Sequence, residues 1–358
     1  MKKAFTFMLA CLFTSFSAFS QGVHFEHLTL QEALNKAKTE NKLVFMDCYT
    51  TWCGPCIYMT DKIFPQKEVG DFFNKHFINI KVDMEKGEGP ELMKKYGITA
   101  FPTFLILLPD GTERHRILDS AEAKTIIERA QQGLKAETSS SYLDKLYADG
   151  KRDKEFLITY VQNLLNNYQR VQAKAVATEL IARLSDEEKL SEEYWFIYTN
   201  STLSGLGSEN FNYMLQHKDK FLKRYGEKEV DGRIFSLHMS LFSQIMREYI
   251  SNFTMEELNK MKKDIPTYRL SAQKELLAGL EIVKSFIEKN PTKMLSVCEK
   301  GFKLLGETGI LSVGIPAINY LKKEISEGQK GRLTKAVDAL AATIKKEQLK
   351  EFIQKLIN

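Results

Sequence analysis

The sequence predicts two folded regions of different class, an α/β domain followed by an all-α domain. Strand-like and helix-like segments alternate over residues 21–134, which is typical of a sheet covered by helices. Over residues 142–358 strand-like alternation almost vanishes, and apolar residues recur at helical spacing. Residues 135–141 (KAETSSS) have little apolar content and predict a linker. A length of 358 residues also favours two domains, at about 150 residues each.

In the first region, four strands are expected as short apolar runs that end at an acid or a turn. They cover residues 43–48, 77–82, 103–108 and a segment ending at Ile117, with Asp110-Gly111 as the turn between the last two. Helices are expected where apolar residues recur three and four positions apart. They cover residues 30–38, 57–64, 69–77, 91–96 and 121–130.

The second region predicts about ten to twelve helices, in lengths that suit antiparallel pairs. Apolar faces are continuous over residues 156–165, 276–287 and 340–356. No regular repeat period is present, so two architectures remain open. The helices form either a solenoid-like stack of hairpins or an irregular bundle.

The first twenty residues predict a secretory signal peptide. The positive pair Lys2–Lys3 precedes a mostly apolar, uncharged stretch over residues 4–19. Small residues follow at the spacing that a signal peptidase recognises. We therefore expect cleavage between Ser20 and Gln21 and export of the mature chain, with the periplasm as its compartment.

Two other fates of this leader stay open. The leader is either retained as an anchor, although its apolar stretch is short for a span of about 20 residues, or lipidated. A lipid anchor would attach at Cys11, because Met8-Leu9-Ala10 before it resembles a lipobox. No later stretch is long and apolar enough to span a bilayer.

The charge of the chain argues against nucleic acid as a partner. Loss of Lys2 and Lys3 with the leader lowers the formal net charge from +5 to +3. No basic cluster with interleaved aromatic residues accompanies this small excess.

The cysteines of the mature chain point to chemistry rather than to a disulfide scaffold. They are Cys48, Cys53, Cys56 and Cys298. One close pair in an exported chain is better explained as a reactive dithiol. Cys48 lies on an apolar strand and Cys298 on an apolar helical stripe, so both are expected to be core thiols. A disulfide joining these two is the alternative.

The pentapeptide WCGPC places two thiols at a strand-to-helix junction. If Cys53 begins the helix, the unpaired N–H groups of the first turn favour its thiolate and lower its pKa. Pro55 suits the first turn, where its missing N–H is not needed. Cys56 lies one turn further and can resolve a mixed disulfide. Zinc sites also use this spacing, but with a second Cys or His pair that this chain lacks, so no metal is expected.

This motif resembles the active site of the thioredoxin family, and two further features match. Asp47 ends an apolar strand six residues before Cys53, and Phe101-Pro102-Thr103 precedes an apolar strand as the family's cis-proline does. The resemblance covers about residues 25–132 and implies a thioredoxin fold, a central mixed sheet flanked by helices. In detail the segment is similar to periplasmic thioredoxin-like domains and to the C-terminal domain of the membrane thiol-disulfide transporter.

The resemblance also implies roles for individual residues. Cys53 would be the nucleophile and Cys56 the resolving thiol. Asp47 would lie buried under Cys56 with a raised pKa and relay its proton. Pro102 would be cis beside the sulfurs and keep metals out. The implied substrate-binding residues are Trp52, Gly54, Pro55, Phe101 and Pro102. No cofactor is implied besides the Cys53–Cys56 disulfide.

The chain departs from the family pattern at three places. Asn79 stands where cytoplasmic members have a lysine facing the buried acid, and Lys81 lies one strand period further on. Asp61 replaces the helix-kinking proline, while Pro65 ends the helix. Ile57 replaces the usual lysine after the second cysteine, which makes the rim of the site more apolar.

Two functions follow from these features. The first is an exported thiol-disulfide oxidoreductase that acts as a reductant on client proteins and depends on a membrane electron donor. The second is a client-binding protein in which the helical domain recruits a partner and the thioredoxin-like domain mainly docks. An aromatic cluster in the helical domain is either a binding surface or core packing: Tyr194, Trp195, Tyr198 and Phe211.

Overall fold

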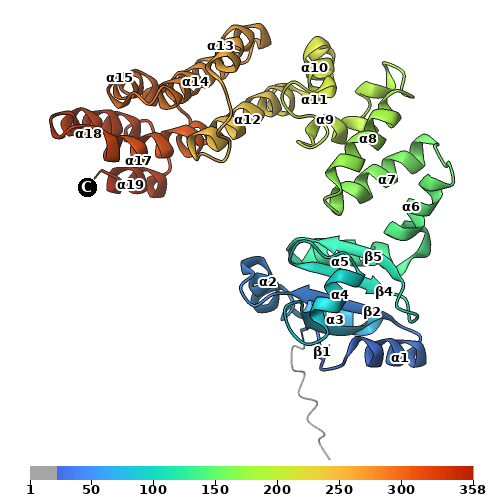
Figure 1. Cartoon of the computed structure of the whole chain (residues 1–358). Helices are drawn as coiled ribbons and strands as arrows, with labels where there is room; N and C mark the ends of the chain where they lie inside the picture. Colours follow the sequence, from blue (N-terminus) through green and yellow to red (C-terminus); the bar gives the residue numbers. More distant parts are fainter. Residues whose placement is uncertain (1–21, 358) are drawn as a thin grey trace, which may run out of the picture. The chain divides into compact units, whose positions relative to one another are not determined.

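The computed structural model describes residues 22–357, and the contacts within it divide the chain into two units, with the boundary in the sequence between Arg183 and Leu184. Figure 1 shows a sheet with covering helices in the first unit and helices in the second. The predicted signal peptide and Cys11 lie outside the described residues. Among the helices of residues 22–357, none combines the length and hydropathy needed to cross a membrane.

The first unit contains a mixed sheet, as the sequence predicts, with five strands instead of the four expected. Its strands are β1 (Phe25–Glu26), β2 (Leu43–Tyr49), β3 (Phe77–Asp83), β4 (Thr103–Leu107) and β5 (Glu113–Leu118). They lie in the order β1-β3-β2-β4-β5; β1 and β2 run parallel to β3, and β4 is antiparallel to β2 and β5. The sequence analysis did not find β1, because two residues are too short to show an alternating pattern.

Helices cover both faces of this sheet. They are α1 (Leu30–Glu40), α2 (Gly54–Tyr58), α3 (Lys67–His76), α4 (Gly89–Lys95) and α5 (Ala123–Leu134). Side chains of α1 and α4 pack on the face formed by Val44, Met46 and Cys48. Those of α3, α5 and the turn after α2 pack on the opposite face, around Phe45 and Phe104. Alternation along β2 therefore points Asp47 to the same face as Phe45, next to α2.

The helix expected over residues 57–64 is not a uniform α-helix. It starts as α2 and continues as a π-helix over Met59–Ile63, where the Phe64 N–H donates to the Met59 carbonyl at 2.8 Å. Asp61, at the position of the family's kinking proline, lies inside this π-helix. A wider turn thus replaces the proline kink, and Pro65 follows directly, as expected.

The segment predicted as a linker, residues 135–141, is folded against the sheet of the first unit. It forms a short 3₁₀ helix at Ala136–Thr138 and the start of α6 (Ser140–Ala148). The backbone N–H of Ser140 donates to Nδ1 of His115 on β5 at 3.2 Å. Burial lowers the pKa of His115 to about 4, so the ring is neutral and its Nδ1 accepts this bond. The domain boundaries expected from the sequence, on either side of residues 135–141, remain a prediction.

Two more helices complete the first unit, α7 (Lys154–Asn166) and α8 (Arg170–Ile181). The apolar face predicted over residues 156–165 is buried on α7, at Phe156, Leu157, Tyr160, Val161 and Leu164. A three-residue turn joins α7 to α8, and its Tyr168 has a left-handed backbone with φ of 55°. This helical segment is attached to the sheet through α6, whose Ser140 bonds to His115 on β5.

The second unit is helical. Its α-helices are α9 (Trp195–Thr199), α10 (Glu209–Gln216), α11 (Lys218–Tyr225), α12 (Glu227–Met246), α13 (Met255–Asp264), α14 (Gln273–Ile287), α15 (Pro291–Gly301), α16 (Glu307–Gly309), α17 (Ile315–Glu324), α18 (Glu327–Ala341) and α19 (Glu347–Lys355). With α6 to α8 they exceed the ten to twelve helices predicted, because several helices are only one or two turns long. The expectation of one last helix over residues 340–356 is wrong, since α18 ends at Ala341 and α19 begins at Glu347.

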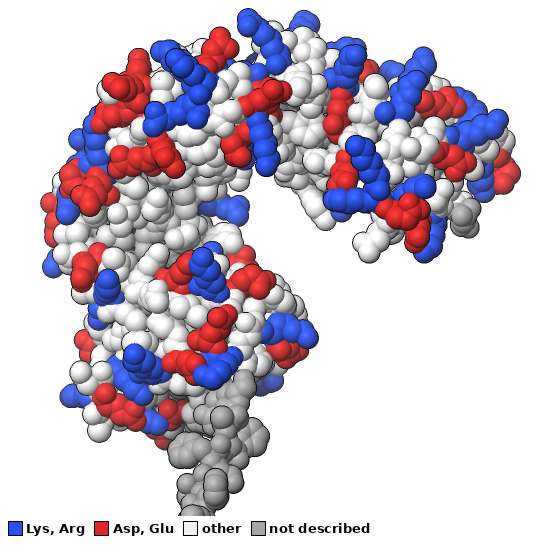
Figure 2. Space-filling model, turned by 180° about the vertical axis from the view of Figure 1, so that it is seen from behind, with Lys and Arg blue, Asp and Glu red and all other residues white. Residues whose placement is uncertain are grey.

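The aromatic cluster singled out in the sequence lies in the core of the second unit. Tyr194, Tyr198 and Phe211 are at most 3% exposed, and the Trp195 ring stacks on Tyr225 at 4.0 Å. Core packing is therefore the correct interpretation of these residues. On the outer surface, Figure 2 shows Lys and Arg side chains interspersed with Asp and Glu over the face in view.

Candidate active site

The two cysteines of the WCGPC motif form a disulfide where β2 leads into α2. Their sulfur atoms are 2.08 Å apart, and both residues are buried, at 4% and 3% exposure. Cys53 is the N-cap of α2, and its Sγ accepts the N–H of Cys56 at 3.1 Å. Gly54 and Pro55, between them, are exposed. This N–H favours negative charge on the Cys53 sulfur when the disulfide is reduced.

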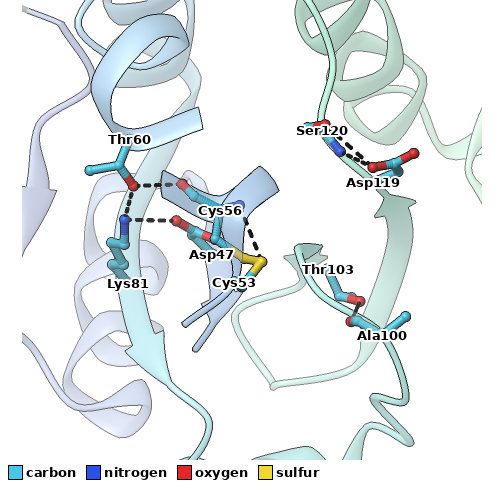
Figure 3. The surroundings of a disulfide bond; sticks show 9 residues. All are labelled: Asp47, Cys53, Cys56, Thr60, Lys81, Ala100, Thr103, Asp119 and Ser120. Carbon is cyan, nitrogen blue, oxygen red and sulfur yellow. Dashed lines mark hydrogen bonds and ion pairs between the residues drawn. A yellow bond between two sulfur atoms is a disulfide. The ribbon is translucent and has the colours of Figure 1, made fainter. Parts of the chain in front are cut away.

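Asp47 lies on β2 beneath this disulfide, and Figure 3 shows its carboxyl group beside the two cysteines. The residue is 1% exposed, and its Oδ1 has no hydrogen-bond partner among the described residues. Burial raises the pKa of Asp47 to about 6, and the nearby Lys81 ammonium opposes only part of this shift. The carboxyl group can therefore take up and release a proton near neutral pH.

Lys81 connects Asp47 to the backbone of the redox helix. Its Nζ lies 3.4 Å from Oδ2 of Asp47 and donates to the hydroxyl of Thr60. That hydroxyl in turn donates to the carbonyl of Cys56 at 2.9 Å. Figure 3 shows this chain of three contacts on one side of the disulfide. Asn79, in contrast, is paired in register with Phe45 and donates to the His24 carbonyl and to Asn74.

The sequence contained a signal for the Asp47–Lys81 pair. Each of the two residues lies four positions after the first residue of its strand, β2 or β3. Parallel pairing sets Leu43 opposite Phe77, which places Asp47 opposite Lys81. Two residues at the same count along parallel neighbouring strands lie on the same face. Thr60 carried no comparable signal, because its contact depends on the π-helix after α2.

The loop before β4 completes the site on its other side. The Phe101–Pro102 peptide bond is cis, in agreement with the sequence-based expectation. Pro102 is buried, and its carbonyl accepts the N–H of Asp119 at 3.1 Å. Figure 3 places Asp119 and Ser120 across the disulfide from Lys81. The loop after β5 is thus attached to the proline loop, which the sequence did not indicate.

Trp52 forms an exposed edge of the site. Its side chain is 67% exposed, its ring meets Phe101 edge-on at 6.2 Å, and its Nε1–H donates to Glu85 at 3.0 Å. Ile57, on the helix, is 48% exposed. The structure therefore brings Asp47 together with Cys53 and Cys56, and Trp52 together with Phe101, with an apolar rim at Trp52 and Ile57.

The other two cysteines of residues 22–357 are free and buried, as expected for core thiols. Cys48 lies on the face of β2 opposite to Asp47, and burial raises its pKa well above the ordinary value. Burial likewise raises the pKa of Cys298. Both thiols therefore stay protonated and unreactive near neutral pH. Within residues 22–357 no cluster of three or more His, Cys, Asp or Glu side chains is arranged to hold a metal ion.

Comparison with known proteins agrees with this geometry. A family model described as "Protein of unknown function, DUF255" (Thioredox_DsbH) matches residues 18–101. Thioredoxin-1 of Drosophila melanogaster is 34% identical over 85 residues, which are 22% of this chain and 75% of that protein. The chain belongs to the thioredoxin family. The similarity lies in the N-terminal part of the chain, here called the thioredoxin domain, which is a thiol-disulfide oxidoreductase domain.

Other relatives match the same domain. Thioredoxin Y1 of Arabidopsis thaliana is 38% identical over 95 residues, 26% of this chain and 52% of that protein. The chain thus spans only about half the length of the plant thioredoxins that it matches. A solution structure of a proposed disulphide-isomerase from Bacteroides thetaiotaomicron is 43% identical, covers 34% of this chain and 99% of that one, and has a TM-score of 0.31.

Proposed function

We propose that this protein is an exported thiol-disulfide oxidoreductase that reduces disulfides in client proteins through Cys53 and Cys56. The observation that carries the proposal is the pairing of a buried disulfide with a buried carboxylic acid on the adjacent strand. Burial raises the pKa of that acid, Asp47, to about 6, which suits proton transfer near neutral pH. A disulfide with a purely structural role needs no such group.

The proposed reaction begins from the dithiol form. The Cys53 thiolate attacks one sulfur of a client disulfide, forms a mixed disulfide and releases the other client sulfur as a thiolate. Cys56, deprotonated by Asp47, then attacks the Cys53 sulfur, which closes the Cys53–Cys56 disulfide and releases the second client thiolate. Two electrons pass to the client, whose thiolates take up two protons. A dithiol donor must then return two electrons to the disulfide.

The surrounding residues have supporting roles in this scheme. Lys81 keeps part of the Asp47 population ionised, so that the group can accept the Cys56 proton. The backbone next to Pro102 and the ring of Trp52 would align an extended client segment beside Cys53. The rim at Gly54 and Pro55 is exposed, which gives a client access to the sulfurs.

Export is proposed from the leader pattern, with the periplasm as the compartment and a membrane protein as the electron donor. The test is the mature N-terminus of the protein purified from its natural host. Cleavage predicts Gln21 as the first residue, whereas a lipid anchor predicts Cys11 modified by diacylglycerol. An intact leader in a cytoplasmic fraction would contradict export.

The reductase proposal is tested by insulin reduction with dithiothreitol and by the redox potential of the Cys53–Cys56 couple. A reducing role predicts turnover of insulin and a reduction potential of about −270 mV, whereas that of a strong oxidant would be about −120 mV. A Cys56→Ser variant should hold clients as mixed disulfides on Cys53. Recovery of the same partners without a covalent link would instead favour docking by the helical region.

A further inference from the structure

Aromatic side chains at the surface of the first unit gather near the redox site, and each is fixed by a carboxylate. Trp52 Nε1–H donates to Glu85 at 3.0 Å, and the Tyr58 hydroxyl donates to Glu122 at 2.6 Å. A third pair has the same form but comes from another part of the chain. The hydroxyl of Tyr168, in the turn between α7 and α8, donates to Oδ2 of Asp119 at 2.7 Å.

The third pair attaches the helical segment directly to the proline loop of the active site. Asp119 donates its backbone N–H to the carbonyl of Pro102 at 3.1 Å, and its other carboxylate oxygen accepts the N–H of Ser120 at 2.7 Å. Figure 3 shows Asp119 and Ser120 across the disulfide from Lys81. Tyr168 is therefore held next to the backbone that would align a client.

Although its hydroxyl is bonded, Tyr168 is 40% exposed. Three residues further on, in the first turn of α8, Val171 is 86% exposed. The redox helix contributes Ile57 at 48% and Tyr58 at 39% exposure. Apolar side chains exposed to this degree are costly to leave in water and mark contact surfaces when they occur together.

We propose that Tyr168 and Asp119 extend the client groove of the redox site onto the α7–α8 turn, and that this groove takes an extended polypeptide with aromatic and basic residues beside its cystine. Continuity with the redox site supports this occupant, since Asp119 is bonded to the proline loop. Charge supports the basic residues on the Trp52 and Tyr58 side, where Glu85 and Glu122 accept the ring hydrogen bonds, whereas the Tyr168 ring already has the chain's own Arg170 over it at 5.5 Å. A lysine or arginine of the client can pair with these carboxylates and lie on the rings.

Fixing the rings also makes them better suited to binding. A free surface tyrosine loses rotamer entropy when a ligand orders it, whereas a ring already held by a hydrogen bond loses less. Trp and Tyr are among the residues that most often dominate binding at protein interfaces. If the Tyr168–Asp119 bond served only to fix the α7–α8 turn, its loss would change stability but not the choice of client.

The inference rests on the proposed reductase function, and its test separates the two. The full-length protein is assayed with dithiothreitol on three disulfides: a cystine peptide with flanking Phe and Lys, the same peptide with Gly and Glu, and hydroxyethyl disulfide. We expect wild type to prefer the first peptide. The variant Tyr168→Ala should lower kcat/KM for that peptide about tenfold, mainly through KM, and change the rate with hydroxyethyl disulfide less than twofold.

A matched control is Tyr142→Ala, since Tyr142 on α6 is also a tyrosine of the first unit with 40% exposure. It should leave all three rates unchanged. Asp119→Asn keeps a residue that tolerates the observed φ of 69° but removes the charge, and it should reduce the preference for the Lys peptide over the Glu peptide. Tyr168→Phe retains the ring and the fold, and should lower kcat/KM for the first peptide about threefold.

Two outcomes overturn the inference while leaving the reductase function intact. Wild type reduces all three disulfides without preference, or the Tyr168 variants change the rates with peptides and hydroxyethyl disulfide by the same factor. If wild type reduces none of the three, the reductase function falls as well.

Discussion

Each unit of the chain contains a buried aspartate paired with a partly buried lysine, and the two pairs differ in geometry. In the thioredoxin domain, Lys81 Nζ and Asp47 Oδ2 are 3.4 Å apart and the other carboxylate oxygen has no hydrogen-bond partner among the described residues. In the helical unit, Lys218 Nζ and Asp231 Oδ1 are 2.7 Å apart, and Lys218 also donates to the carbonyl of Tyr268 at 2.5 Å. The same residue types thus form a loose pair and a tight one.

The difference shows how a site and a structural contact can be told apart. In the helical unit the shorter ion pair and the Lys218 bond to the Tyr268 carbonyl offset part of the cost of burying the charges, and the pair joins α11 to α12. The loose pair leaves burial as the main influence on Asp47, and its pKa is raised to about 6. Because Lys81 stabilises the ionised form of Asp47 only in part, the carboxyl group can bind and release a proton near neutral pH.

The largest expected difference between the two regions concerns their cysteines. Cys53→Ala removes the proposed nucleophile and should lower insulin reduction by at least roughly a thousandfold. Cys298→Ala, in the helical unit, should keep this activity and lower the free energy of unfolding by about 1–2 kcal/mol, because the thiol is packed in the core. Turnover and urea unfolding measure the two effects. Loss of turnover in Cys298→Ala would show that the helical unit takes part in the redox reaction.

The tight pair should be the more sensitive to loss of one partner. Asp231→Ala leaves the buried ammonium of Lys218 without its carboxylate and should destabilise the helical unit by roughly 3 kcal/mol. Asp219→Ala, which changes an exposed acid next to Lys218, serves as the control and should cost less than about 0.5 kcal/mol. Urea unfolding followed by circular dichroism compares the two. Equal stability of both variants would mean that the Lys218–Asp231 pair does not stabilise this unit.

Removal of the loosely paired acid should have the opposite sign. The fold raises the pKa of Asp47 from 3.8 to about 6, so the folded state binds the proton more tightly than the unfolded chain. The stability conferred by the protonated form is present below about pH 4 and is lost as the pH rises to about 6. At pH 7.5, Asp47→Asn should therefore stabilise the oxidised protein by about 2–3 kcal/mol.

The pH dependence of unfolding provides the check on this sign. In wild type, stability should fall between about pH 4 and pH 6, and in Asp47→Asn this decrease should be absent. The same variant should resolve mixed disulfides more slowly at pH 7, since it cannot accept the Cys56 proton. A wild-type stability that increases across this pH window would contradict a raised pKa.

The sequence predicted those parts of the site that local pattern determines. The disulfide pair, the acid Asp47 on the preceding strand and the cis bond at Pro102 lie within short motifs whose neighbours fix their position; β2 continues past Asp47 to Tyr49, beyond the end expected from the sequence. Contacts between distant segments were missed, and the bond from Tyr168 to Asp119 joins residues 49 positions apart. The boundary at Ala341 was missed because apolar spacing continued past the end of α18 into the residues that lead to α19. Periodicity locates a buried face, but it does not show where the backbone turns.

The smallest expected effect concerns the influence of Lys81 on Asp47. Its ammonium lies 3.4 Å from the carboxylate and favours the ionised form, so Lys81→Met should raise the pKa of Asp47 further, by roughly one unit above its value near 6. The pH at which wild-type stability stops falling should then move upward by the same amount. The rate of mixed-disulfide resolution should show the same upward shift in its pH profile.

Lys86→Met is the matched control for this last change. Lys86 pairs with Asp83 at the end of the same strand at 3.0 Å, but its side chain is 71% exposed and it does not face Asp47. It should leave both pH profiles in place. If the two variants gave the same profiles, Lys81 would have no more influence on Asp47 than an exposed lysine has. The pKa of Asp47 would then be set by burial alone. A shift confined to Lys81→Met would show that the Lys81 ammonium, 3.4 Å from the carboxylate, helps to set the pKa of Asp47.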